Sequence, residues 1–402
     1  MKKKLLIIIF IILSLYLFLY LYNNNYHIDN GIPIIDIKLK DINLDDVHKD
    51  KSIEYDNNKI SIYDNNKRVI NGKIGFKGRG NFTWTLDKKP YRISFDEKTK
   101  VLDLPLSKKY VLLANHADSS LLKNDFTYSV AKKMNLNYSF TGEFVDLYID
   151  KHYIGNYYIT PKIDISKEIV DLKDDNALLV ELDNSYYKSE DKYFTTIILN
   201  DHIVLKESNN EKDNHNFKVF EEKYNNVEEC IINQDYYCLE ENIDIDSFIK
   251  YYIISEYSEN PDSLQSSLYM YMDGLDDKIH IGPIWDFDIA YGLKPQYSSY
   301  DRFLIKEDLI NEKETSKLFF NLLKISEFED RTISYWNSTA KDIYKEEISN
   351  VDKKINYLNK SGTYNNDYWN LNTFKRSTSM FKYWINHRYD FINNAIGNDN
   401  NE

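Results

Sequence analysis

The 402-residue sequence predicts an α+β protein with a β-rich N-terminal part and a mainly helical C-terminal part. Short alternating apolar runs, separated by Asn-Asn, Asp-Asn and Gly turns, extend from Ile34 to about Phe95. The last hundred residues instead show helical spacing, with Trp336, Trp369 and Trp384 as expected core anchors. The length exceeds that of one compact unit, so we expect two lobes or a pair of domains.

The N-terminus predicts a membrane anchor. Residues 5–22 are almost continuously apolar and long enough to cross most of a bilayer's hydrocarbon as a helix. Lysines at positions 2–4 precede this segment and no small-x-small cleavage pattern follows it, which favours an uncleaved signal anchor over a cleaved leader. The positive-inside tendency then keeps residues 1–4 cytoplasmic, and a polar spacer at 23–32 leads to an extracytoplasmic domain of a single-pass protein.

The composition is that of a folded, acidic protein. Hydrophobic residues make up 42% of the chain, with 35 tyrosines and 20 phenylalanines, which is ample for a core. The net charge of −13 argues against a nucleic-acid-binding surface, because such a field repels polyanions. The same charge mildly favours basic partners.

The two cysteines, Cys230 and Cys238, can pair outside the cytoplasm. If the segment between them is one continuous helix, however, they lie about 12 Å apart, too far for a disulfide. Neither their spacing nor the pattern of the eight histidines indicates a zinc site.

A glycine-rich segment, GFKGRG at 75–80, is the first with possible chemistry. Its glycines allow the backbone to approach a ligand, and Lys77 and Arg79 are interspersed with them, so the loop can cradle phosphates. It matches neither the P-loop nor the glycine-rich kinase loop, and a tight hairpin with surface lysines is the alternative. Further cationic candidates at the start of the next strand are Lys88, Lys89 and Arg92.

The following elements complete the expected β-rich lobe. Residues 109–114 predict a strand, and residues 121–134 predict a helix capped by Asp118, Ser119 or Ser120. Residues 144–149 and 153–160 predict a hairpin. Sheet, helix and further sheet together resemble a small nucleotide-clamping lobe, which we place at 33–165. The mainly helical lobe then covers 166–395, beginning with an ambiguous region that contains a strand-like run at 178–183.

The segment from Ser255 to Gly292 carries the strongest functional signal. The helical pattern of 246–258 ends at Pro261, which cannot continue a helix, so Asp262 is presented from a loop. Strand-like runs at 267–272 and 278–284 follow, joined by an Asp-Gly turn.

The tetrapeptide Trp285-Asp286-Phe287-Asp288 comes directly after the second run. If its backbone stays extended, both carboxylates point one way and both aromatics the other. A loop aspartate, a hairpin and a second acidic site in this order are the layout of a phosphoryl-transfer site. Turn aspartates that only satisfy local backbone groups are the structural alternative.

Ordered motifs from about Gly75 to Phe391 give the chain a family resemblance: it resembles the spore coat protein H, or CotH, kinase family. The motifs are RGNFTW at 79–84 with KKPYRISF at 88–95, VLLANHADSSLLKND at 111–125, the hairpin FVDLYIDKHYIGNYYIT, VELD at 180–183, the Asn-Pro-Asp loop and GPIWDFDIAYG at 282–292.

The resemblance implies an atypical protein kinase-like two-lobed fold. It also implies transfer of the ATP γ-phosphate to serine or threonine of surface or spore coat proteins, with Mg²⁺ or Mn²⁺. On matching positions, Asp262 would be the catalytic aspartate, and Asp286 with Asp288 would hold the metal. Phosphate charge would be neutralised by Arg79, Lys89 and Arg92. A basic, serine-rich coat or surface protein is the expected substrate.

Three positions depart from this pattern. Ser267 stands where a conventional kinase places its metal-ligating Asn, Pro161 where many relatives have Glu, and Asp125 is the only acid of the helix at 120–134. A non-catalytic coat or cell-surface assembly protein that retains the fold is therefore the alternative. A carboxylate-dependent glycoside hydrolase is a third interpretation, but it leaves the basic glycine segment unexplained.

Overall fold

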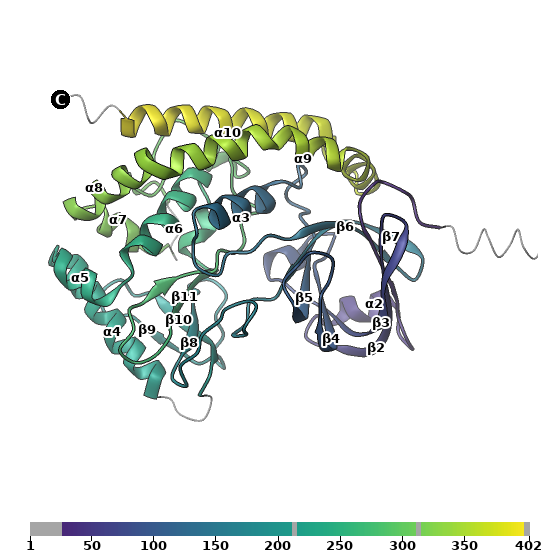
Figure 1. Ribbon diagram of the computed structural model, residues 1–402, viewed down its shortest axis with the longest axis horizontal. Coiled ribbons are helices and arrows are strands. Elements are labelled where there is room, and N and C mark those ends of the chain that lie inside the picture. Colours follow the sequence, from purple (N-terminus) through teal and green to yellow (C-terminus); the bar gives the residue numbers. More distant parts are fainter. Residues whose placement is uncertain (1–25, 211–214, 311–314, 398–402) are drawn as a thin grey trace, which may run out of the picture.

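The computed structural model describes residues 26–210, 215–310 and 315–397. A β-barrel forms one side of the molecule, and a second sheet with most of the helices forms the other (Figure 1). The expected membrane anchor at 5–22 lies outside the described residues. Within the described ranges, every helix is too short or too polar to cross a bilayer.

The barrel consists of strands drawn from the first part of the chain, in the order β1-β2-β3-β4-β5-β7-β6. A parallel pairing of β1 with β6 closes it, with Ile35 opposite Leu147, while the other neighbours are antiparallel. The sequence predicted a β-rich region at 34–95 and strands at 109–114, 144–149 and 153–160, but not their closure into a barrel. They are β1 (Ile34–Lys38), β2 (Tyr55–Asp64), β3 (Lys67–Gly78), β4 (Tyr91–Thr99), β5 (Ser107–Leu113), β6 (Glu143–Ile149) and β7 (His152–Pro161).

Alternation along the strands produces two hydrophobic cores. Tyr110 and Leu112 of β5 point into the barrel, whereas Val111 and Leu113 point outward into the core of the other half. Phe144 and Tyr158 of β6 and β7 also belong to this outer core. Strands buried on both faces attach the barrel firmly to the rest of the molecule.

The second sheet is antiparallel, with the strand order β12-β11-β8-β10-β9. The predicted hairpin is present, although its second strand covers only two residues. The strands are β8 (Leu178–Leu182), β9 (Tyr193–Thr195), β10 (His202–Ser208), β11 (Leu268–Met272) and β12 (His280–Ile281).

Helices cover this second sheet and carry its connections. The predicted helix after β5 is α3 (Lys123–Lys133), and the Asp118 carboxylate accepts the N–H of Lys123 at 3.0 Å. Helix α2 (Leu44–Lys49) lies against the barrel instead (Figure 1), where its Val47 joins the barrel core. The others are α4 (His215–Ile232), α5 (Tyr236–Asn242), α6 (Ile245–Ser258), α7 (Leu318–Leu322), α8 (Ser326–Tyr335), α9 (Lys341–Tyr368) and α10 (Phe374–Gly397). Short helical turns are η1 (Phe82–Thr85), η2 (Pro261–Leu264), η3 (Pro295–Tyr297) and η4 (Trp336–Ala340).

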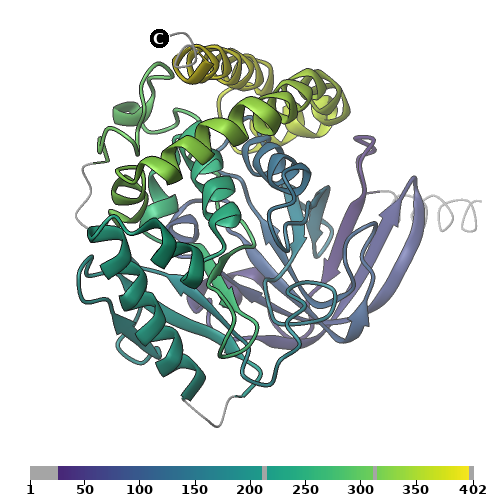
Figure 2. The same ribbon diagram turned by 60° about the vertical axis from the view of Figure 1, so that its left-hand side comes forward.

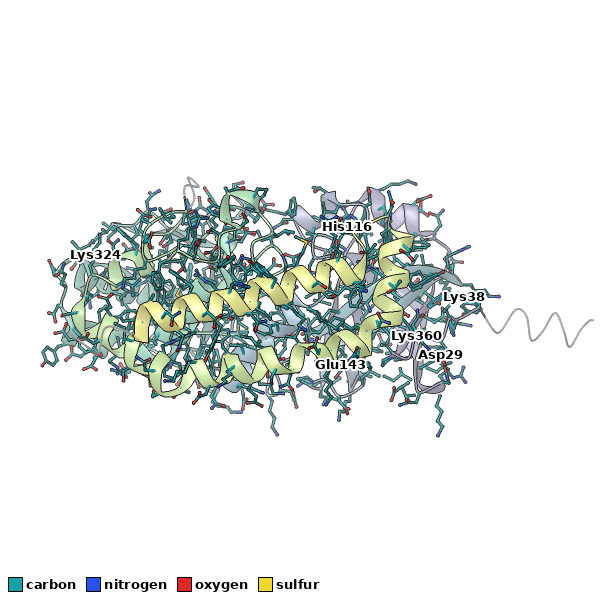
Figure 3. All side chains as sticks on the ribbon, turned by 90° about the horizontal axis from the view of Figure 1, so that it is seen from above. Asp29, Lys38, His116, Glu143, Lys324 and Lys360 are labelled. Carbon is teal, nitrogen blue, oxygen red and sulfur yellow. A yellow bond between two sulfur atoms is a disulfide. The ribbon has the colours of Figure 1, made fainter. Side chains whose placement is uncertain are left out.

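The two long C-terminal helices span the molecule. In Figures 1 and 2, α9 and α10 run across the top, and Figure 3 shows them side by side in the view from above. Trp336 and Trp384 are buried, as expected of core anchors. The same expectation for Trp369 is wrong, because this residue is half-buried and donates its indole N–H to the Ile154 carbonyl of β7 at 2.9 Å.

Cys230 and Cys238 form a disulfide with their Cα atoms 5.7 Å apart. The chain between them is not a continuous helix, since α4 ends at Ile232, Gln234 adopts φ 55°, and α5 starts at Tyr236. Because of this break, the two cysteines lie at about half the distance that a continuous helix would impose. Of the two alternatives left by the sequence, the disulfide is the one that forms.

Candidate active site

A cavity of about 330 Å³ lies between the barrel and the second sheet. It contains four of the six residues predicted for the site: Asp262, Asp286, Asp288 and Arg79. They come from segments up to 209 positions apart in sequence, counted from position 79 to position 288. The volume falls in the range of small-molecule sites, roughly 300–1,000 Å³.

Asp262 is presented by the turn that ends α6. Glu259 adopts a left-handed conformation with φ 45°, which stops the helix, and Pro261 occupies the first position of η2. The Asn260 side chain caps η2 by accepting the N–H of Asp262 at 3.3 Å. The Lys294 ammonium lies 3.7 Å from the Asp262 carboxylate.

Asn260 also joins the two acidic segments. Its side-chain N–H donates to the backbone carbonyl of Asp286 at 3.0 Å, while its carbonyl oxygen caps the Asp262 turn. Asn260 is 1% exposed, so this bridge is shielded from water. One side chain therefore sets the position of the Asp262 loop relative to the Asp286 backbone.

The predicted extended backbone at 285–288 is wrong. Strand β12 ends at Ile281, and Asp286 adopts φ 67°, a left-handed conformation that interrupts strand geometry. Both carboxylates still face the cavity, but so does Trp285, which was expected on the opposite side. Phe287 has no exposed surface and lies in the core, and Trp285, 6% exposed, borders both this core and the cavity.

Helix α3 holds the Asp286–Tyr291 segment in this shape. The Asn124 side-chain carbonyl accepts the N–H of Phe287 at 2.8 Å, and the Lys123 ammonium donates to the Ala290 carbonyl at 2.6 Å. The hydroxyls of Thr127 and Tyr291 are 2.6 Å apart. The run at 111–125 therefore supports the acidic loop through Lys123 and Asn124, and its residues Leu113, Ala114, Asn115 and Asn124 also line the cavity.

Burial and mutual repulsion raise the pKa values of the paired acids. Burial raises the pKa of Asp286 to about 6, opposed by Arg79 and reinforced by Asp262 and Glu181. Burial and then the Asp286 carboxylate raise the pKa of Asp288 well above its ordinary range, against the pull of Lys123. A divalent cation held by these carboxylates would relieve both effects.

The oxygen donors of this pair fit Mg²⁺ or Mn²⁺. The described residues contain no group of three or more His, Cys, Asp or Glu arranged to enclose a metal. Mg²⁺ is commonly held by one or two carboxylates together with substrate phosphates and water. Asp286 and Asp288 are therefore enough as protein ligands. Their carboxylates are also hard ligands, as this ion prefers.

Arg79 follows the end of β3, where its N–H donates to the Pro90 carbonyl at 3.2 Å. Its guanidinium lies over the Trp285 ring, 5.5 Å from the centroid, at the cavity wall. The neighbouring Gly80 has φ 86° and also lines the cavity. At Gly78, by contrast, a Cβ would lie 2.2 Å from the Trp84 ring, so this glycine serves packing.

The structure does not place Lys89 or Arg92 in the cavity. The Lys89 ammonium donates to the carbonyls of Trp84 and Leu86 at 2.9 and 3.0 Å. Arg92 forms an ion pair with Glu54 at 2.6 Å on the barrel. Strand alternation and the closed barrel direct these side chains to other partners, so the phosphate-binding role predicted for them lacks support from the geometry.

Residues 76–392 match the family model described as CotH kinase protein, which covers most of the chain. The chain belongs to the CotH kinase family. A search of the curated proteins found no match to it.

Sequence reasoning assigned no role to several residues that line the cavity of this CotH family member. Glu181 and Asp183, 6% and 7% exposed, come from the VELD run that ends β8, and Lys206 comes from β10. Burial raises the pKa of Asp183 to about 6, and Glu181 adds to the rise. The signal was available for the acids, because two carboxylates two apart in a buried strand share a face. No pattern in the sequence indicated a role for Lys206.

Proposed function

We propose that this CotH family protein is a protein kinase that transfers the γ-phosphate of ATP to serine or threonine hydroxyls with Mg²⁺ or Mn²⁺. The single observation that carries the proposal is that Asp262, Asp286, Asp288 and Arg79 face one cavity. Along the sequence these residues lie far apart. Their convergence is what phosphoryl transfer requires, since positioning and charge neutralisation supply most of the rate.

The two halves of the molecule would act as the lobes of an atypical kinase-like fold. The barrel contributes Arg79, while the second sheet and its loops contribute the acids. The closed barrel differs from an open sheet, so the relation to kinases is proposed from the site and the family, not from the barrel itself.

Each residue then has a distinct task. Asp262 lies within the turn best placed to orient the attacking hydroxyl and accept its proton. Asp286 and Asp288 would hold the divalent cation, which neutralises charge on the nucleotide phosphates. Arg79 would contribute positive charge from its place over the Trp285 ring.

The charge balance of the cavity supports a metal requirement. Among the described residues, its lining includes three basic side chains and six acidic ones: Arg79, Lys188 and Lys206 against Glu181, Asp183, Asp191, Asp262, Asp286 and Asp288. Such a lining repels a free triphosphate. Nucleotide should therefore bind only together with divalent cations.

The proposal is tested with the full-length chain, purified in mild detergent, by incorporation of labelled γ-phosphate into a lysine-rich, serine-containing peptide. Asp262→Asn should lower kcat at least about 10³-fold with little change in stability. The exposed Asp276→Asn serves as the matched control and should retain full activity. Unchanged incorporation by Asp262→Asn would reject the assignment.

The location of the domain is part of the proposal. We propose a single-pass membrane protein whose catalytic domain lies outside the cytoplasm, at the cell surface or in the spore coat, acting on a basic, serine-rich protein there. The Cys230–Cys238 disulfide supports export, because disulfides persist in oxidising compartments. The apolar run at 5–22 supplies the proposed anchor.

A non-catalytic coat-assembly protein is the second candidate, favoured by Ser267 at the position of the usual metal-ligating Asn. It predicts no thermal stabilisation by ATP with Mn²⁺. A nucleotide at 100 times its Kd should instead stabilise the folded state by about 2.7 kcal/mol. A thermal-shift titration of the full chain distinguishes the two.

A further inference from the structure

Phosphoryl transfer needs a cation close to the transferred group, and the predicted candidates leave this role open. Lys89 and Arg92 are held by other partners outside the cavity. Arg79 lies over Trp285 on the barrel wall. Besides Arg79, the basic side chains that line the cavity in the described ranges are Lys188 and Lys206; Lys294, whose ammonium lies 3.7 Å from the Asp262 carboxylate, is not part of the lining.

Lys206 is directed toward the cavity by an irregularity of its strand. Val204 and Leu205 of β10 lie opposite Glu181 and Val180 of β8, but the register then shifts before Glu207. Lys206 is the extra residue of this β-bulge. Bulges are frequent next to active sites because they re-aim one side chain without ending the strand.

Glu181 fixes Lys206 and the Asp262 loop together. One carboxylate oxygen lies 2.6 Å from the Lys206 ammonium, and the other accepts the backbone N–H of Ser267 at 3.0 Å. Glu181 is 6% exposed, whereas 36% of the Lys206 side-chain surface is exposed to solvent. The lysine is therefore anchored on one side and accessible to a ligand on the other.

The ammonium stays charged in this setting. Burial favours the neutral amine, but the Glu181 carboxylate outweighs it and the pKa of Lys206 is raised. Lys188 lacks a comparable anchor in the described residues, since its ammonium is 3.9 Å from Glu190 and its side chain is 67% exposed. Lys206 is thus the better fixed of the two cations.

We propose that Lys206 is a catalytic residue that contacts the equatorial oxygens of the transferred phosphoryl group, with Glu181 as its positioning residue. This inference rests on the proposed kinase function. In the step, the substrate oxygen–phosphorus bond forms and the bond from phosphorus to the β,γ-bridging oxygen breaks. ADP leaves and the hydroxyl proton passes to Asp262. Lys206 keeps its proton throughout and offsets the developing negative charge.

The test compares Lys206→Met with the double variant E181Q/K206M in the full-length chain. Peptide phosphorylation gives kcat and KM, and binding of ATP with Mn²⁺ gives Kd. The double variant is needed because Lys206→Met alone leaves Glu181 buried without its counter-charge. We expect both variants to lose kcat by about 10²–10³-fold, with Kd changed only several-fold. Lys173→Met, an exposed lysine outside the cavity, is the matched control.

A purely structural ion pair gives the opposite result, because the double variant would then recover the wild-type kcat. That recovery would overturn the inference while leaving the proposed function intact.

The single variant Glu181→Gln tests the positioning role. Loss of the carboxylate lowers the pKa of Lys206, so the alkaline limb of the pH profile of kcat should move to lower pH. An alkaline limb that stays at the same pH would show that Glu181 does not position Lys206. A wild-type chain that neither binds ATP with Mn²⁺ nor transfers phosphate would overturn the proposed function and this inference with it.

Discussion

At the scale of single residues, the site depends on side chains that do not themselves meet a substrate. Asn260 touches both acidic segments, through the N–H of Asp262 and the carbonyl of Asp286. Buried hydrogen bonds of this kind restrict a loop to one arrangement because breaking them leaves unpaired polar groups. Asn260 should therefore affect both the rate of the reaction and the stability of the fold.

We expect Asn260→Ala to lower kcat about 10- to 100-fold, because a small misplacement of a catalytic group is costly, and to lower the free energy of unfolding by about 1–2 kcal/mol. Phosphorylation kinetics and urea denaturation measure the two effects. Asn386→Ala, whose exposed amide bonds only within α10, should leave both unchanged. Equal kcat in the two variants would contradict the bridging role.

A second residue, Asp201, should make stability depend on pH. It is 1% exposed, accepts the hydroxyl of Ser316 and the amide of Asn184, and faces the Glu228 carboxylate. Burial, chiefly, raises the pKa of Asp201 to about 6 from an ordinary value of 3.8. The folded state thus binds more protons than the unfolded state between these values, so stability falls as pH rises through this window.

The expected loss is about 3 kcal/mol between pH 4 and pH 7, from a difference of about two pKa units. Asp201→Asn mimics the neutral acid and should remove this part of the pH dependence. Urea denaturation of both proteins across the range gives the comparison. Parallel stability curves for the wild type and the variant would show that Asp201 is not the group responsible.

At the scale of elements, the C-terminus of α6 is fixed by α10. Arg388 of α10 is fully buried and forms ion pairs with Glu256 and Glu259 at 3.0 and 3.1 Å. Glu256 in turn accepts three backbone N–H groups at 304–306. The Arg388 guanidinium also donates to the carbonyls of Tyr257, Tyr300 and Arg302. This network holds the helix that precedes the Asp262 loop.

Replacing Arg388 should be strongly destabilising, because it leaves the buried acids Glu256 and Glu259 without their counter-charge. We expect Arg388→Met to cost about 3–5 kcal/mol in the free energy of unfolding. Arg376→Met on the same helix removes an exposed arginine and should change it by less than about 0.5 kcal/mol. Chemical denaturation of both variants tests this. A cost for Arg388→Met below 1 kcal/mol would mean that the network is dispensable.

At the scale of the whole molecule, buried polar groups fasten the barrel to α9. The Asn365 side chain of α9 accepts the ammonium of Lys88 at 2.8 Å and the N–H of Asn156 at 2.9 Å. Ser361, one turn earlier, donates to Asp146 of β6 at 2.6 Å. Lys88 has no exposed surface, and burial lowers its pKa well below the ordinary range. The two halves that face the cavity are therefore joined by contacts that water cannot replace.

Loss of these hydrogen bonds should destabilise both the barrel and α9. We expect Asn365→Ala to lower the free energy of unfolding by about 2–4 kcal/mol, since Lys88 and the Asn156 N–H lose an acceptor. Hydrogen exchange should quicken in β7 and α9 alike. The exposed Asn359→Ala on the same helix is the control. Faster exchange confined to α9 would show that the barrel is held by other contacts.

The sequence by itself determined the α+β class, the strands of the N-terminal part, the helix after β5, and the loop that presents Asp262. These features depend on local periodicity, on proline and on caps, which act over a few residues. It also identified the three acids that the cavity brings together. The signal was their order along the chain, with Asp262 after a helix that Pro261 ends and the paired acids directly after the predicted hairpin.

Only the tertiary structure decided what those side chains meet. The pairing of β1 with β6 closed the barrel, packing against α3 turned the backbone at Asp286, and Lys89 and Arg92 were taken up by partners on the barrel. The bulge at Lys206 was equally hidden. A local pattern reports that a face is buried but not against which distant segment, and the chemistry of this site lies in those distant contacts.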